Sequence, residues 1–264
     1  MLLSIIFLSI IATAIGHPSN LNGINKYLHS DVKIYGGRPT TIDKVPYQVS
    51  IYKSGKFYCG GSIISENWII TASHCLNNIV SNDFEVYTIR SGSTYHNESG
   101  TIHTVADIVR HEDHGLDIWR HPVNDIAVVR VNEKFTFDNT RKSIKLFDEN
   151  EIAPEDADAI ISGWGYTENG LPINLQIVYV PIINKEKCFD YYKTTGGIPE
   201  KQICAGYADG GKDACTGDSG GPLVLDNRLV GIASWGRGCA QPGWPGVYTE
   251  ISAYREWITK HTGI

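Results

Sequence analysis

The stretch DACTGDSGGP, residues 213–222, places one serine between an aspartate and two glycines. A serine hydroxyl attacks a carbonyl carbon efficiently only when a base takes its proton, a third group orients that base, and fixed N–H donors meet the oxyanion. Ser219 could be such a nucleophile, because Gly217 and the glycines after Ser219 allow a tight turn whose N–H groups point inward. Taken alone, the motif could equally be a simple turn.

Two further residues could supply the base and the group that orients it. His74, in TASHC, stands beside a cysteine that would pin it, and Asp125, in NDIAVV, opens an apolar strand where a carboxylate could be buried and aimed. Each has an ordinary structural interpretation by itself. Together with Ser219 they indicate a base, an orienting acid and a nucleophile for acyl transfer.

The segments that must position these residues are short apolar runs separated by turn residues. Runs such as YQVSIY, NWIITAS, AIISGWG and LQIVYVPI are rich in Val, Ile, Tyr and Trp. This pattern predicts an all-β sandwich or barrel. Only residues 252–261 have the spacing of a helix, and Ser252 is its predicted N-cap.

Composition and charge narrow the class of protein. The chain has 264 residues, 42% of them hydrophobic and 20% charged, which suits one large globular domain or two small ones. The formal net charge is -6 and no block of the sequence is basic, which argues against a nucleic-acid partner.

The amino-terminal segment, MLLSIIFLSIIATAIG, is an apolar run that ends in small residues. It is short for a membrane span and predicts a secretory signal peptide, residues 1–16, cut after Ala14 or Gly16, with a retained membrane anchor as the alternative. In a secreted chain, six cysteines indicate disulfides rather than metal ligands, although six allow fifteen pairings.

Eight motifs in order resemble a trypsin-like member of the chymotrypsin family of serine proteases, from residue 34 to the C-terminus. They are IYGG (34–37), CGGSII (59–64), TASHC (71–75), NDIAVV (124–129), SGWG (162–165), DACTGDSGGP (213–222), SWGRGCA (234–240) and PGVYT (245–249). The resemblance implies an all-β fold of two packed six-stranded antiparallel β-barrels with a C-terminal helix, divided near residue 140.

The resemblance also implies a role for each candidate residue. Ser219 would attack the peptide carbonyl, His74 would move its proton, and Asp125 would hold the imidazole. The backbone N–H groups of Gly217 and Ser219 would form the oxyanion hole. No cofactor and no metal are implied.

A zymogen is implied by Asp218, which in the family turns inward to pair with a newly made amino terminus. That terminus would be Ile34, released by a cut after Lys33, with residues 17–33 as propeptide and residues 34–264 as the peptidase domain. Before the cut the oxyanion hole should be poorly formed. Tyr35 departs from the Val or Ile usual in the family, which puts the packing of this terminus in question.

Asp213 matches the residue at the bottom of the primary specificity pocket of trypsins. Gly236, Gly246 and Tyr192 match residues of the pocket walls. These matches imply cleavage after Arg or Lys. Ala214 stands where many trypsins have a serine, so one hydrogen-bond partner of a bound lysine is missing and Arg should be preferred.

The implied disulfides are Cys59–Cys75, Cys188–Cys204 and Cys215–Cys239, a six-cysteine set like that of arthropod digestive trypsins. The calcium loop of vertebrate trypsins needs paired acidic ligands, and SGSTYHNESG offers only Glu98, so no calcium site is expected. The segment 111–125 is about three residues longer than its counterpart in a simple trypsin and would overhang the substrate. Its three histidines suggest either a metal or a solvated loop, and Arg237 beside the cleft would favour acidic residues upstream of the cut bond.

The sequence therefore predicts a secreted, monomeric serine endopeptidase made as a zymogen, with protein substrates and protein protease inhibitors as partners. One alternative is a non-catalytic protease homologue that binds or signals. A second is an activating protease of a clotting or immune cascade, whose usual upstream domain has no room in a 17-residue propeptide. A third is chymotrypsin-like or elastase-like specificity, which Asp213 argues against.

Overall fold

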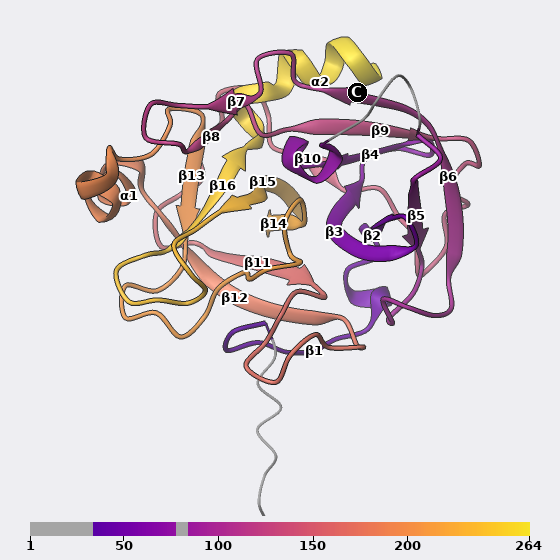
Figure 1. Ribbon diagram of the computed structural model, residues 1–264, viewed down its shortest axis with the longest axis horizontal. Helices are drawn as coiled ribbons and strands as arrows, with labels where there is room; N and C mark the ends of the chain where they lie inside the picture. Colours follow the sequence, from indigo (N-terminus) through magenta and orange to yellow (C-terminus); the bar gives the residue numbers. More distant parts are fainter. Residues whose placement is uncertain (1–33, 78–83) are drawn as a thin grey trace, which may run out of the picture. The chain divides into compact units, whose positions relative to one another are not determined.

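The computed structural model describes residues 34–77 and 84–264, and the predicted signal peptide and propeptide lie outside these residues. Most of the regular secondary structure of the described chain consists of short antiparallel strands that close into two barrels, coloured indigo to magenta and orange to yellow in Figure 1. Both barrels belong to a single compact unit.

The first barrel closes in the order β2-β3-β4-β9-β6-β5. Its strands are β2 (Gln48–Lys53), β3 (Lys56–Ile63), β4 (Trp68–Thr71), β5 (Tyr87–Ser91), β6 (Thr101–Arg110) and β9 (Ala127–Val131). Strands β2 and β3 meet at a two-residue turn, where Ser54 and Gly55 have φ of 50° and 75°. Positive φ at both central residues matches the twist of a tight hairpin, which is why a glycine stands there.

The second barrel runs β12-β11-β14-β15-β16-β13 and closes through pairing of β12 with β13. Its strands are β11 (Asp158–Gly163), β12 (Gln176–Ile183), β13 (Gln202–Ala205), β14 (Pro222–Leu225), β15 (Arg228–Trp235) and β16 (Gly246–Glu250). Two short strands join its edges: β1 (Arg38–Pro39) pairs with β12, and β10 (Lys145–Leu146) pairs with β15. The prediction of two six-stranded barrels is confirmed, and residue 140 lies between the last strand of the first barrel and the first strand of the second.

The predicted terminal helix is present as α2 (Arg255–Thr262), but Ser252 does not cap it. Ser252 lies inside a 3-10 turn, Ile251–Tyr254, and the residue at the N-cap position is Tyr254. A second helix, α1 (Lys185–Tyr192), was not predicted from the sequence; the Asn184 side chain caps it by accepting from the Lys187 N–H. This helix buries only Cys188 and Tyr192, so its apolar periodicity is too brief to stand out.

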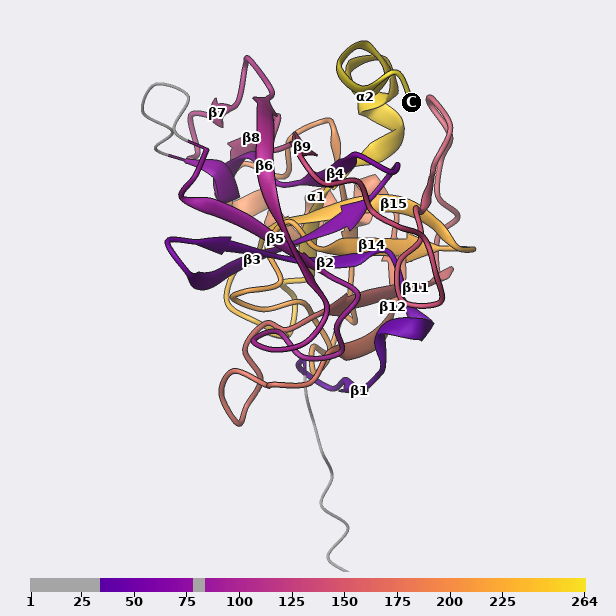
Figure 2. The ribbon, with the colours of Figure 1, turned by 90° about the vertical axis from the view of Figure 1, so that its right-hand side faces the viewer.

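Helix α2 returns from the second barrel to lie beside β9 of the first (Figure 1). In both views the segment between β6 and β9 lies at the same end of the molecule as α2 (Figures 1 and 2). That segment carries a small hairpin of β7 (Gly115–Leu116) and β8 (Pro122–Val123). Trp257 of α2 anchors the segment, since its Nε1 donates to Glu112 Oε2 at 2.8 Å.

The cysteines form three disulfides, Cys59–Cys75, Cys188–Cys204 and Cys215–Cys239, which is the pairing that the resemblance implied. The first joins β3 to the turn that follows β4, and the third joins two loops of the second barrel. Among the described residues, no helix is long and apolar enough to cross a membrane.

Candidate active site

The three candidate catalytic residues lie on different elements. His74 lies in a 3-10 turn, Ser73–Leu76, that follows β4, and Asp125 lies two residues before β9. Ser219 lies in the turn that precedes β14 of the second barrel. The site is therefore assembled from loops at the ends of strands of both barrels.

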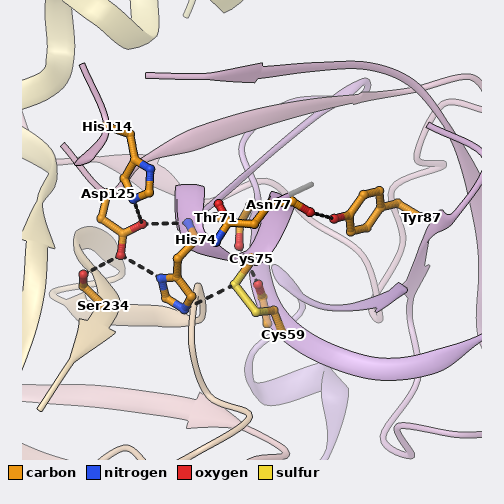
Figure 3. The surroundings of a disulfide bond; sticks show 10 residues. Cys59, Thr71, His74, Cys75, Asn77, Tyr87, His114, Asp125 and Ser234 are labelled. Carbon is orange, nitrogen blue, oxygen red and sulfur yellow. Dashed lines mark hydrogen bonds and ion pairs between the residues drawn. A yellow bond between two sulfur atoms is a disulfide. The ribbon is translucent and has the colours of Figure 1, made fainter. Parts of the chain in front are cut away.

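His74 and Asp125 are joined by two hydrogen bonds (Figure 3). The His74 backbone N–H donates to Asp125 Oδ1 at 2.9 Å, and Nδ1 of the ring lies 2.8 Å from Oδ2. A carboxylate can only accept, so the ring proton is on Nδ1. The other nitrogen, Nε2, is then free to accept a proton, as a general base must be.

Donors surround the Asp125 carboxylate, whose side chain has 0% of its surface exposed. Ser234 Oγ donates to Oδ2 at 2.5 Å, and His114 Nε2 lies 3.4 Å from Oδ1. Burial by itself raises the pKa of this carboxyl, but the hydrogen bonds from His114, His74 and Ser234 outweigh it and hold the pKa of Asp125 well below its usual range. The carboxylate is therefore ionised at neutral pH.

The loop of Ser219 is fixed against the first barrel. The Ser219 carbonyl accepts from the Gly60 N–H at 2.8 Å, and Gly60 follows Cys59, whose disulfide partner, Cys75, is next to His74. Gly220 packs so closely that a Cβ there would lie 2.1 Å from Thr71 Oγ1. Among the described residues, the Ser219 hydroxyl has no hydrogen bond to the His74 ring; such bonds are often loose in the absence of substrate.

The predicted oxyanion hole lies in the same turn. Gly217 has φ of 98°, a conformation that only glycine adopts without strain. Within the described chain, the N–H groups of Gly217 and Ser219 donate to no backbone carbonyl, whereas the Asp218 N–H between them donates to the Cys215 carbonyl at 2.9 Å. The two N–H groups are therefore available to an external oxygen.

Asp218 is turned inward and is completely buried. Its oxygens accept from the backbone N–H groups of Gly165 at 2.8 Å and Cys215 at 3.0 Å. Burial nevertheless raises the pKa of Asp218 to about 6, since the two hydrogen bonds offset only part of the desolvation. Ile34 is also fully buried, and the next residue, Tyr35, accepts from the Asp213 N–H at 3.2 Å.

A cavity of about 240 Å³ is lined by both Ser219 and Asp213. The Asp213 side chain is buried, and its Oδ2 accepts from the Ala240 N–H at 3.0 Å. Its other oxygen, Oδ1, is one of the buried polar atoms of the described residues that have no hydrogen-bond partner. Burial raises the pKa of Asp213 to about 7, and the neighbouring Asp218 adds to the rise. Within the described chain, the Asp213 carboxylate therefore has the Ala240 N–H as a donor but no cationic partner.

The predicted wall glycines line the cavity, as does Ala214. A Cβ on Gly246 would lie 2.5 Å from Asp213 Oδ1, so a larger residue there would cover the carboxylate. A Cβ on Gly236 would have no atom closer than 3.6 Å, so a larger side chain would fit at this position in the cavity lining. Both positions keep the path to Asp213 open.

Tyr192, predicted as a wall residue, is not among the residues that line the cavity but contacts Trp235, which is. Its ring packs edge-on against Trp235 and Trp244, and its hydroxyl donates to the Pro245 carbonyl at 2.6 Å. Tyr192 therefore braces the wall from behind. Arg237 is exposed and lies over the Trp244 ring, with its guanidinium carbon 4.3 Å from the ring centroid.

The three histidines of the long segment 111–125 do not gather. His111 stacks on Trp257, His121 stacks on Trp235, and His114 faces Asp125. Within the described ranges, the one cluster at metal-binding spacing is Cys59, His74 and Cys75, whose two sulfurs are already joined in a disulfide. It offers a metal only the His74 ring.

Sequence reasoning missed Ser234 and His114, the two residues that complete the shell around Asp125. Ser234 stands in the SWGRGCA motif, which is a signal that could have been used. His114 lies eleven positions before Asp125 in a loop of irregular length, and no spacing rule connects the two residues.

Two closed barrels, a histidine paired with a buried aspartate, and a serine in a tight glycine turn define the class of two-barrel serine hydrolases. The profile of the family described as Trypsin matches residues 34–258, and the chain belongs to this family. It is a trypsin-like serine endopeptidase, so the predicted family and enzyme class are confirmed.

Several insect proteins are similar to this chain over most of its length. The vitellin-degrading protease of Bombyx mori is 40% identical over 233 residues, which cover 88% of this chain and 86% of that protein. Hypodermin-B of Hypoderma lineatum is 43% identical over 235 residues, 88% of each chain. Trypsin delta of Drosophila erecta is 40% identical over 265 aligned residues, 99% of this chain and 100% of that protein.

Proposed function

We propose that this protein is secreted as a zymogen and, once cut after Lys33, cleaves protein chains after Arg or Lys. The observation that carries the specificity is the buried Asp213 carboxylate, whose Oδ1 has no partner within the described chain, at a cavity shared with Ser219. A guanidinium or ammonium group entering this cavity would supply the missing charge. A neutral side chain would leave a buried carboxylate unpaired, which costs about 3–5 kcal/mol.

The proposed reaction begins when Ser219 Oγ attacks the peptide carbonyl while His74 Nε2 takes the hydroxyl proton. The C–N bond then breaks, and His74 returns the proton to the leaving amine, which leaves an acyl-enzyme on Ser219. Water, deprotonated by the same histidine, hydrolyses this ester. Asp125 is suited to its part because it accepts from the His74 backbone N–H and from the ring Nδ1, and its ionised carboxylate stabilises the imidazolium.

The oxyanion formed in each step would be held by the N–H groups of Gly217 and Ser219. Neither group is engaged by a backbone carbonyl in the described chain, and Gly217 has the positive φ of a tight turn. Each donor of this kind typically contributes about 3–4 kcal/mol to transition-state stabilisation.

Activation would depend on Asp218. Its buried carboxyl has a pKa raised to about 6, so an incoming positive charge would be strongly favoured. A cut after Lys33 would turn the Ile34 nitrogen into an ammonium group, in a segment that already lies beside Asp213. Pairing with Asp218 would then stabilise the turn that carries Gly217 and Ser219.

The remaining expectations concern partners and location. The apolar amino-terminal run and the three disulfides support secretion, because disulfides persist in oxidising compartments. Protein protease inhibitors that present Arg or Lys to the Asp213 cavity are the expected partners. We expect the protein to act as a monomer and without a cofactor.

The decisive test is hydrolysis of short peptide amides ending in Arg, Lys, Phe, Leu or Ala by the protein cut after Lys33. We expect turnover after Arg and Lys only, lost in Ser219→Ala and absent before the cut. Turnover after Phe or Leu would overturn the role of Asp213, and equal activity before and after the cut would overturn the zymogen. No turnover at all would favour a non-catalytic binding protein.

A further inference from the structure

We propose that His114 is a positioning residue for the catalytic pair, acting through Asp125 as an Nε2–H donor whose tautomer is set by Arg110. This inference rests on the proposed roles of His74 and Asp125. Figure 3 shows His114 and Ser234 on either side of the Asp125 carboxylate, with the His74 ring reaching the same group from a third direction.

The tautomer follows from the partner on the far side of the ring. Arg110 Nη2 lies 2.8 Å from His114 Nδ1. A guanidinium carries donors and no acceptor, so Nδ1 must accept. In a neutral imidazole the proton is then on Nε2, the atom that lies 3.4 Å from Asp125 Oδ1. The arginine thereby makes His114 a donor toward the carboxylate.

Arg110 is itself held in place by the turn that carries His74. Its Nε donates to Ser73 Oγ at 2.9 Å, and its Nη2 donates to Asn77 Oδ1 at 2.9 Å. Ser73 precedes His74, and Asn77 is the C-cap of the same 3-10 turn. Hydrogen bonds therefore run from the His74 turn through Arg110 to His114, whose Nε2 lies 3.4 Å from Asp125 Oδ1.

His114 completes the set of donors around a carboxylate that water does not reach. Oδ2 faces the His74 ring and Ser234, while Oδ1 faces the His74 backbone N–H and His114. A carboxylate has about four lone-pair sites, and a buried site left empty costs free energy. A fourth donor also withdraws charge from the carboxylate, so the carboxylate stabilises the His74 imidazolium less strongly.

Other charged or titratable groups near Asp125 have separate partners. Tyr254 donates to Asn124 Oδ1 at 2.9 Å, and burial together with Asp125 raises the Tyr254 pKa above its usual range, so this phenol stays neutral in acid. Glu250 is paired with Lys185. The groups that face Asp125 directly are therefore His74, His114 and Ser234, with Arg110 behind His114.

The test compares His114→Phe, which removes the donor, with His114→Gln, whose amide N–H can face Asp125 while its carbonyl accepts from Arg110. For His114→Phe we expect kcat on an Arg peptide amide to fall about tenfold with KM unchanged. The acid limb of the kcat profile should move upward by roughly half a pH unit, because a carboxylate with one donor fewer stabilises the His74 imidazolium more. His114→Gln should restore both values.

The matched control is His111→Phe, the same change in the same segment at a ring that stacks on Trp257 and not on Asp125. It should leave kcat and the acid limb as in the wild type. If His114→Gln loses as much as His114→Phe, the role is packing and the proposal fails. It also fails if His114→Phe keeps the wild-type kcat and acid limb.

A second measurement is independent of activity. Nitrogen NMR of the Ser219→Ala protein at pH 8 reports which ring nitrogen of His114 carries the proton. We expect Nε2–H in this protein and a mixture of tautomers in Arg110→Gln. A proton on Nδ1 of His114 would overturn the inference whether or not the wild type hydrolyses peptides. If the proton is on Nε2 but the wild type, cut after Lys33, hydrolyses no peptide, only the proposed function is overturned.

Discussion

The two barrels contribute buried aspartates in contrasting states. Asp125, at the edge of the first barrel, is surrounded by donors, and its pKa lies below the usual range. Asp213 and Asp218, in the second barrel, are just as buried but have fewer donors, and their pKa values are raised to about 7 and 6. Burial alone therefore does not decide the charge of an aspartate; the number of donors that the fold supplies decides it.

The catalytic pair of the first barrel, His74 and Asp125, is therefore complete, whereas the two aspartates of the second barrel are not fully compensated. Within the described chain, hydrogen bonds already orient His74 and keep the Asp125 carboxylate ionised. Among the described residues, the carboxyls of Asp213 and Asp218 have no positive partner; a substrate side chain would give one to Asp213, and a new amino terminus would give one to Asp218. Each of the following substitutions changes one side of this contrast.

The largest effect on activity is expected at Asp125, in the complete catalytic pair. Asp125→Asn should lower kcat on an Arg peptide amide by about 10⁴-fold, because an amide N–H facing His74 forces the proton of the ring onto the wrong nitrogen. Steady-state kinetics at pH 8 measure the loss. Asp113→Asn, an exposed change in the same segment, should be neutral. A loss smaller than tenfold for Asp125→Asn would show that the ordered pair is not the catalytic one.

The next largest effect is on the free energy of unfolding, and it concerns Asp213, whose buried carboxyl has no cationic partner among the described residues. In the Ser219→Ala background, Asp213→Asn should stabilise the protein at pH 8 by up to about 4 kcal/mol, because a shift of some three pKa units disfavours the folded state once the carboxyl must ionise. The folded pKa is raised, so the penalty is absent below about pH 4, grows between pH 4 and 7, and is full above pH 7.

Denaturant unfolding at pH 4 and pH 8 measures this difference. Asp209→Asn, an exposed aspartate of the second barrel, serves as the control and should change stability equally little at both values. A gain for Asp213→Asn that is as large at pH 4 as at pH 8 would mean that packing, and not an ionisable group without a partner, is responsible.

The smallest effect is expected from Ala214→Ser, which adds a hydroxyl to the lining of the same cavity. An additional hydrogen bond to a bound ammonium should raise kcat/KM for Lys relative to Arg by up to about tenfold. The ratio of the two rates in one competition assay measures the change. An unchanged ratio would show that a bound lysine does not reach residue 214.

The sequence predicted those parts of the site that lie within continuous motifs. Ser219, Gly217 and Asp218 occupy one turn, and His74 lies beside a cysteine, so local spacing was informative. The two-barrel fold and the three disulfides came from the resemblance, because six cysteines alone allow fifteen pairings.

Contacts made only by the tertiary fold could not be predicted. His114 and Arg110 meet because a strand and the loop after it fold back toward the His74 turn, and neither residue type is unusual at its position. The edge-on packing of Tyr192 against Trp235 and Trp244 is another such contact. Ser252 failed as a cap because a 3-10 turn intervenes before α2.

The pairing of β1 with β12 has a consequence for the kinetics of activation. Arg38 and Pro39 are fixed on the second barrel, so Ile34 is tethered to it by the short stretch 35–37. At about 3.5 Å per residue, the end of this tether searches a sphere of roughly 14 Å radius. One terminus confined to a sphere of that radius has a local concentration on the order of 0.1 M. Once the chain is cut, capture of the new terminus would therefore be unimolecular, independent of protein concentration, and resistant to free amines well below that concentration.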